Sequence, residues 1–159
     1  RHGKLHPTPC RNPRQPHQSI GAMMGYDYHI VKTDHWLDAA SNPITKEDVD
    51  KLILADKDLK WSQTDYVEIA EEHGYTTRYY AILWHNSPVF WWHKDEIMCS
   101  HPSKSQLMKM IEIGNRLQAN VVGDDGERYC VKKRFLGRRE LCIELMVNNE
   151  LVRMPYTHE

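Results

Sequence analysis

The chain has 159 residues, of which 40% are hydrophobic and 27% charged, and its formal net charge is -1. These values are typical of one soluble globular domain, and no apolar run reaches the roughly 18 residues that a transmembrane helix needs. The N-terminal residues also lack the apolar block of a signal peptide. The sequence therefore predicts a protein of the cytoplasm.

Charge is distributed unevenly along the chain. The first 25 residues contain four basic residues and no acidic one, whereas residues 26–159 contain 17 basic and 22 acidic residues, a net charge of -5. Phosphate binding needs a clustered basic surface, so the acidic part argues against nucleic acid as the main ligand and permits a basic protein partner. The scattered cysteines, Cys10, Cys99, Cys130 and Cys142, favour free thiols over a disulfide framework.

Residues 1–25 contain four prolines and almost no large apolar residue. Such a segment buries too little surface to offset chain ordering, so we expect a disordered, basic leader, or a remnant of upstream translation or of cloning. His6, Cys10 and His17 lie within it, and their flanking prolines favour a chance grouping over a metal site. A single domain is expected over residues 26–159.

Periodicity and capping signals predict the elements of that domain. The alternation in residues 26–33 predicts a strand, followed by a loop. Thr45 with Asp48, and Ser103 with Gln106, form capping boxes that open helices over residues 45–55 and 103–119. Further strands are expected at 59–64, from 65 into an acidic hairpin loop, on both sides of the Asn86–Pro88 turn, and at 95–100, 120–122, 128–135, 141–147 and 151–154.

This order of elements predicts an α+β fold, with a largely antiparallel sheet and two helices packed against it, because short turns join most of the strands. In the strand that contains Trp91 and Trp92, adjacent side chains point to opposite faces. Core packing explains both tryptophans, and the alternative is that one of them is an exposed anchor for a protein partner.

No complete catalytic motif occurs in the sequence. His85 and His93 flank a predicted turn, and together with Asp95 and Glu96 they form the alternative ligand site, for metal or acid–base chemistry. Cys99 with His101 has no third group to orient it, and residues 123–127 are explained as a turn rather than a calcium or phosphate loop. The cations around residues 132–139 suggest nucleic acid, but no aromatic platform is interleaved with them.

Four stretches resemble a widespread family of short, mostly uncharacterised bacterial proteins. They are YDYHIVKTDHW, NPITKEDVDKLI, VFWW and LMKMIEIGNRLQANVVGDDGERY, and together they cover roughly residues 26–130. Members of this family are similar to immunity or accessory proteins encoded beside secreted polymorphic toxins. The resemblance implies a cytoplasmic inhibitor that binds a cognate toxin, and it supplies no catalytic motif.

The leading hypothesis is therefore a non-enzymatic, immunity-type protein that covers the active site of a toxin, and the alternative is a small enzyme or a ligand- or metal-binding domain. We expect no cofactor, no bound metal, and neither nucleic acid nor membrane as partner; the sequence does not predict the oligomeric state. Acidic side chains are expected to steer a basic partner and aromatic ones to anchor it. These partner-binding residues are Asp65, Glu68, Glu71, Glu72, Tyr79, Tyr80, Trp91 and Trp92.

Overall fold

The computed structural model describes residues 26–157, except the side chains of Thr64, Asp65 and Val67. The predicted leader, with His6, Cys10 and His17, lies outside the described residues. No helix in the described part is both long and apolar enough to cross a membrane.

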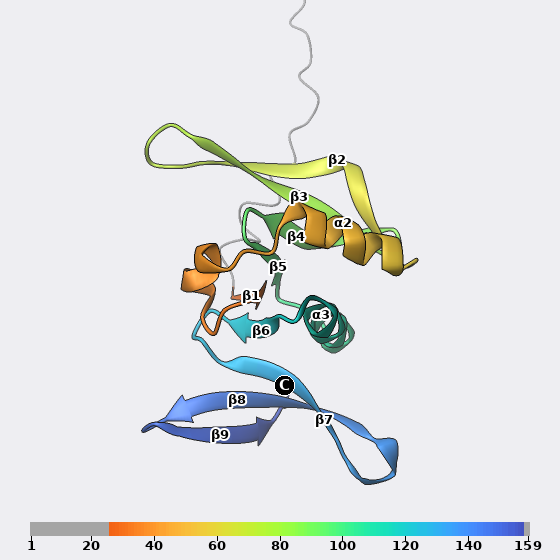
Figure 1. The fold of residues 1–159 in the computed structure, drawn as a ribbon, viewed down its shortest axis with the longest axis vertical. Helices are drawn as coiled ribbons and strands as arrows, with labels where there is room; N and C mark the ends of the chain where they lie inside the picture. Colours follow the sequence, from red (N-terminus) through yellow and green to blue (C-terminus); the bar gives the residue numbers. More distant parts are fainter. Residues whose placement is uncertain (1–25, 158–159) are drawn as a thin grey trace, which may run out of the picture.

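One sheet of nine strands runs through the described residues (Figure 1). The strand order is β2-β3-β4-β5-β1-β6-β7-β8-β9, and every neighbouring pair is antiparallel. The first strand of the sequence therefore lies in the middle of the sheet. The strands are β1 (Asp27–Val31), β2 (Leu59–Ala70), β3 (Thr76–Trp84), β4 (Ser87–His93), β5 (Glu96–Ser100), β6 (Asn120–Gly123), β7 (Arg128–Lys133), β8 (Arg139–Val147) and β9 (Glu150–Pro155).

Two α-helices, α2 (Lys46–Ala55) and α3 (Lys104–Leu117), pack on one face of this sheet. Both begin with the predicted capping boxes: the side chains of Thr45 and Ser103 accept hydrogen bonds from the backbone N–H of Asp48 and Gln106, whose side chains accept in return. The fold is thus α+β with two main helices on a large antiparallel sheet, as predicted from the order of elements.

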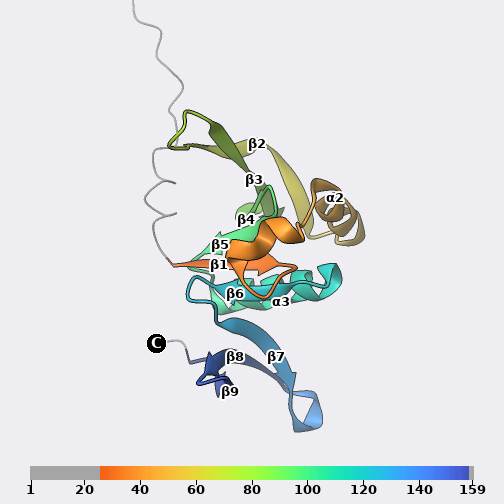
Figure 2. The same ribbon diagram turned by 60° about the vertical axis from the view of Figure 1, so that its left-hand side comes forward.

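The main core lies between these helices and the sheet. Leu52 of α2 and Leu107 and Met110 of α3 pack with Ile30 and Phe90 of the sheet, and all five are nearly or fully buried. On the opposite face, a short 3-10 helix, η1 (Trp36–Ser41), lies against β1 and β6 (Figure 2). We call this opposite face the second face of the sheet.

Two local predictions were wrong. Residues 59–70 form one strand of 12 residues rather than two short ones, and its register with β3 shifts between Trp61 and Tyr66. Such an irregularity lets a long strand bend without breaking. Residues 36–41 form η1 instead of a loop, because the side chain of His35 accepts a hydrogen bond from the backbone N–H of Leu37 and caps the turn.

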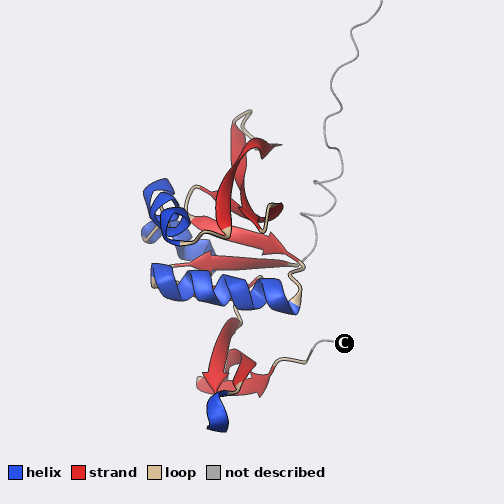
Figure 3. Ribbon diagram, turned by 90° about the vertical axis from the view of Figure 1, so that its right-hand side faces the viewer, coloured by secondary structure: helices blue, strands red, loops and turns tan. Residues whose placement is uncertain are grey.

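The two ends of the sheet extend past the helices. Figure 1 shows β2 and β3 at one end and β7, β8 and β9 at the other, and Figure 3 shows the three C-terminal strands extending beyond α3. A 3-10 turn, η2 (Phe135–Gly137), closes the β7–β8 hairpin.

Candidate functional site

A buried histidine lies at the centre of the second face. His29 of β1 is 2% exposed, and its two ring nitrogens contact two carboxylates. Nδ1 lies 2.8 Å from Oε2 of Glu96 on β5, and Nε2 lies 2.9 Å from Oδ1 of Asp124, which follows β6. Because β5 and β6 are the two neighbours of β1, the sheet itself brings these three side chains together.

The surroundings of His29 favour its charged form. Burial alone lowers the pKa of this imidazole, but the hydrogen bonds and charges of Glu96 and then of Asp124 outweigh burial and raise the pKa above its ordinary value. An imidazolium donates from both nitrogens, which matches the two carboxylate contacts. The indole of Trp36 covers the ring, and its Nε1 donates to the backbone oxygen of Asp124.

A second polar group involves the same turn but lies on the helix face of the sheet. Tyr26 and Tyr129 both donate to Oε1 of the buried Glu127, the bond from Tyr129 being 2.6 Å long. Gly123 leaves space for this arrangement, because a Cβ at that position would lie 2.7 Å from the hydroxyl of Tyr26 and would also overlap the carboxylate of Glu127. The turn predicted for residues 123–127 thus also positions side chains.

Asp27 completes the polar centre. Its backbone N–H donates to Oδ2 of Asp124 over 2.8 Å, and its carboxylate accepts from the hydroxyl of Ser100. Burial raises the pKa of the Asp27 carboxyl, and the nearby charge of Asp124 adds to the rise. Each of these acids is thus engaged by a neighbour in the sheet.

The chemistry of this centre is that of a structural clamp. Both nitrogens of His29 are occupied, so the ring has no free position for proton transfer to a substrate. The buried thiol of Cys99 has a pKa raised to about 12 by burial, which keeps it protonated and unreactive. Among the described residues, no group of three or more histidine, cysteine or acidic side chains has an arrangement that holds a metal ion.

The structure does not assemble the alternative ligand site. His85 lies in the turn before β4 and His93 is the last residue of that strand, so the length of β4, roughly 20 Å at the usual rise per residue, separates them. Glu96 pairs with His29, and His93 stacks on Tyr79 with ring centroids 4.0 Å apart. Burial lowers the pKa of His93, and the charge of Lys94 lowers it further.

The predicted partner-binding residues are divided between the two faces. Trp92 lies on the helix face, where its Nε1 donates to the backbone oxygen of Ile44, and Trp91 and Tyr79 lie on the second face. The opposite orientation of the adjacent tryptophans is as predicted. Trp92 packs against the main core rather than standing free.

The acidic members of the predicted set lie on β2 and in the loop that follows it. Glu68 pairs with Arg78 over 2.7 Å, and Glu71 lies 3.5 Å from Lys94. Glu72 is exposed and makes no ion pair with the described part of the chain. The side chain of Asp65 lies outside the described residues.

The outer half of the β2–β3 hairpin is a two-stranded ribbon that no third strand extends. β3 pairs with β4 only from Tyr80 onward, whereas its pairing with β2 continues outward to Ala70 and Thr76. We call residues 66–79 the β-ribbon; from the Val67–Tyr79 pair outward, no third strand lies beside this hairpin. The exposed aromatic side chains on it and at its base are Tyr66 (47% exposed), Tyr75 (73%) and Tyr80 (38%).

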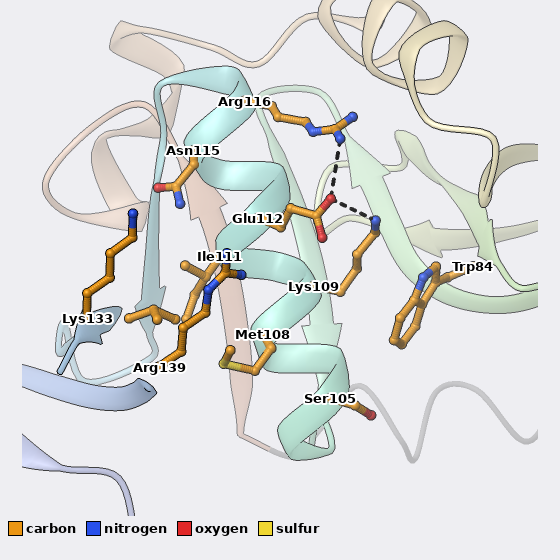
Figure 4. Close-up of a pocket in the computed structure, with 11 residues that line it drawn as sticks. Trp84, Ser105, Met108, Lys109, Ile111, Glu112, Asn115, Arg116, Lys133 and Arg139 are labelled. Carbon is orange, nitrogen blue, oxygen red and sulfur yellow. Dashed lines mark hydrogen bonds and ion pairs between the residues drawn. The ribbon is translucent and has the colours of Figure 1, made fainter. Parts of the chain in front are cut away.

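A basic groove of about 800 Å³ lies along α3 (Figure 4). Lys133 of β7 and Arg139 of β8 line it on one side, and Lys109 and Arg116 line it from the helix. The two helix cations are already neutralised, since both contact Glu112, and Lys109 also donates to Asp56 over 2.7 Å. Only Lys133 and Arg139 lack a counter-charge within the described residues.

Comparison with known proteins identifies no relative: no family model, no curated protein and no solved structure matches this chain. The resemblance to immunity proteins stays a prediction.

Sequence reasoning missed the residues around His29. One signal was present, because the alternation in the first strand places Asp27 and His29 on the same face as Val31. Two ionisable residues on one face of a buried strand require partners. Asp124 and Glu96 are 95 and 67 residues away from His29, and no local pattern identifies them.

Proposed function

We propose that this chain is a non-enzymatic binding protein of the immunity type, which inhibits a cognate toxin by covering its active site with the β-ribbon. The observation that carries this proposal is the ribbon itself. A hairpin that no third strand extends is less stable than a larger sheet, so a partner that packs on it stabilises it as well as binding it. Three exposed tyrosines supply the large, rigid contact area that is enriched in binding hot spots.

Charge favours a basic partner surface. Residues 66–79 contain Glu68, Glu71 and Glu72 against one cation, Arg78. Complementary charge steers association more than it adds affinity, so the acidic side chains set the rate of encounter and the tyrosines set the lifetime of the complex. Arg78 lies over the ring of Tyr66 at 4.9 Å and holds that ring in place.

The test compares two double variants of the full chain. Tyr75→Ser/Glu72→Lys alters the β-ribbon, and Leu54→Ser/Glu150→Lys is the control, which replaces an exposed apolar residue and an exposed glutamate elsewhere. Each protein is immobilised and exposed to lysate of the source organism, and retained proteins are identified by mass spectrometry. Candidates are then expressed alone and together with this chain.

We expect the unaltered chain and the control variant to retain a basic protein. The ribbon variant should bind this protein at least ten-fold more weakly and fail to retain it. Expression of the basic protein alone should stop growth, and co-expression with the unaltered chain or the control should restore it. Equal rescue by the ribbon variant would remove the ribbon from the interface. A retained protein without any effect on growth would contradict the inhibitor function.

A further inference from the structure

The tip of the β7–β8 hairpin exposes two adjacent apolar side chains. Phe135 is 88% and Leu136 86% exposed, and neither belongs to a hydrophobic cluster of the described residues. Single exposed apolar residues are common on soluble proteins, but two adjacent ones at the end of a projecting hairpin form a small apolar patch. We call Phe135 and Leu136 the apolar point. This point lies at the end of the sheet opposite to the β-ribbon.

The backbone of the tip holds these side chains outward. Leu136 and Gly137 have φ values of 64° and 74°, and the N–H of Arg134 donates to the carbonyl of Arg138 over 2.6 Å, which closes the loop. Leucine rarely adopts the left-handed region, and glycine adopts it readily. The closed loop therefore presents Phe135 and Leu136 away from the sheet.

Five cations, which we call the basic collar, flank the apolar point in the β7–β8 hairpin, and two of them, Lys133 and Arg139, also line the groove along α3. Lys133 lies directly opposite Arg139 in the β7–β8 ladder, an arrangement of like charges that destabilises a strand pair unless an anion neutralises it. Arg134 pairs with Glu140. The other cations of this collar make no ion pair within the described part of the chain: they are Lys132, Lys133, Arg138 and Arg139.

The distribution of charge along the chain determines which end of the molecule can approach an anionic surface. Residues 128–157 carry seven basic and three acidic residues, a net charge of +4, whereas residues 26–127 carry 10 basic and 18 acidic residues, a net charge of -8. An anionic surface attracts the first part and repels the second. Within residues 26–157, contact is therefore favourable only through the end that bears the tip.

We propose that this tip docks the protein on an anionic phospholipid bilayer, with Phe135 and Leu136 at the boundary between headgroups and acyl chains and the cations among the headgroups. Apolar side chains at the centre of a basic collar match the layering of such a surface. A nucleic acid fits less well, because it needs an extended basic contact surface and the acidic part limits contact to the tip. From the sequence we expected no membrane partner because the chain has no long apolar run. That criterion detects transmembrane helices and does not detect two exposed apolar residues in a loop.

The experiment is sedimentation of the full chain with vesicles of phosphatidylcholine containing 30% phosphatidylserine, and with vesicles of phosphatidylcholine alone. Three variants are compared with the unaltered chain. Phe135→Ser/Leu136→Ser removes the apolar point, Lys133→Ala/Arg139→Ala removes the opposed cations, and Leu37→Ser/Leu54→Ser removes exposed leucines elsewhere as the matched control.

We expect binding to the anionic vesicles that falls with added salt, and no binding to phosphatidylcholine alone. Each lost cation should lower the partition constant about five-fold, which corresponds to the ~1 kcal/mol that a Lys or Arg near an anionic surface contributes to binding. The serine double variant should lose at least ten-fold, and the leucine control should match the unaltered chain.

Absence of vesicle binding would overturn the proposal, and so would binding that the tip variants leave unchanged. Binding of a DNA duplex that both tip variants abolish, without vesicle binding, would assign the collar to nucleic acid instead. The β-ribbon variant should bind vesicles normally, so failure of this proposal and failure of the proposed function are distinguishable.

Discussion

The imidazole of His29 lies parallel to the indole of Trp36, with ring centroids 4.8 Å apart and 6° between the ring planes. A charged imidazole on an aromatic face is stabilised by the ring's electrons, and more so where water is excluded. Trp36 therefore supports the same protonation state that Glu96 and Asp124 favour.

Stability should depend on pH through His29. The folded-state pKa of this histidine lies above the ordinary 6.5, so its contribution is fully present below pH 6.5 and is lost as the pH rises through the folded-state value. Denaturant unfolding between pH 6 and pH 9 should show a decreasing free energy of unfolding for the unaltered chain. His29→Gln should be less stable by about 1–3 kcal/mol at pH 6 and should show a weaker decrease. The same slope in both proteins would show that another group is responsible.

The pair of Lys109 and Asp56 should be strongly coupled. Both side chains are 7% exposed, and the lysine's charge, together with its hydrogen bond, lowers the pKa of Asp56 against the effect of burial. Removal of one partner leaves a buried charge, so Lys109→Met should cost about 3 kcal/mol. Lys109→Met/Asp56→Ala should cost less than the sum of the single changes, as a double-mutant cycle in urea would show. Additive costs would mean that the ion pair contributes nothing beyond packing.

Gly123 should not tolerate a methyl group. In Gly123→Ala the new Cβ overlaps Glu127 and the hydroxyl of Tyr26, so we expect a loss of about 1–3 kcal/mol in thermal or urea unfolding. The control is the same change in a Glu127→Ala background, where the overlapping carboxylate is absent and the additional loss should be smaller. An equal loss in both backgrounds would show that the carboxylate of Glu127 is not the obstacle.

The contribution of the α3 capping box to the free energy of unfolding should be measurable with a single substitution. Ser103→Ala removes the acceptor for the backbone N–H of Gln106 and should cost about 1 kcal/mol. Lys104→Ala, at the neighbouring exposed position, should change the free energy of unfolding by less than half of that. If both variants unfold alike, the box contributes no stability in this context.

Local signals predicted much of the fold. The two helix starts follow from Thr45 and Ser103, because a capping box is complete within four residues. Most strands follow from alternation between turns. The order of the strands could not be predicted in this way, since nothing within residues 26–33 indicates that this strand has neighbours on both sides.

The candidate sites show the same limit. The β-ribbon follows from an acidic hairpin that the sequence predicts, but the absence of a third strand beside Tyr79 depends on where β4 ends. The contact of His29 with Glu96 and Asp124 depends on pairing across the whole sheet. Proximity in sequence had instead suggested a site that contains both His85 and His93. The length of β4 keeps these two residues apart.

The central position of β1 has a consequence for synthesis of the protein. Asp27 of β1 pairs with Ser100 of β5, 73 residues later, and Tyr28 pairs with Gly123 of β6, 95 residues later. At a translation rate of about 5–20 residues per second, β1 waits roughly 5–20 s on the ribosome before both of its edges are covered. During that time a strand containing Ile30 and Val31 is open on both sides, so chaperones that bind extended apolar segments should select this strand in the nascent chain.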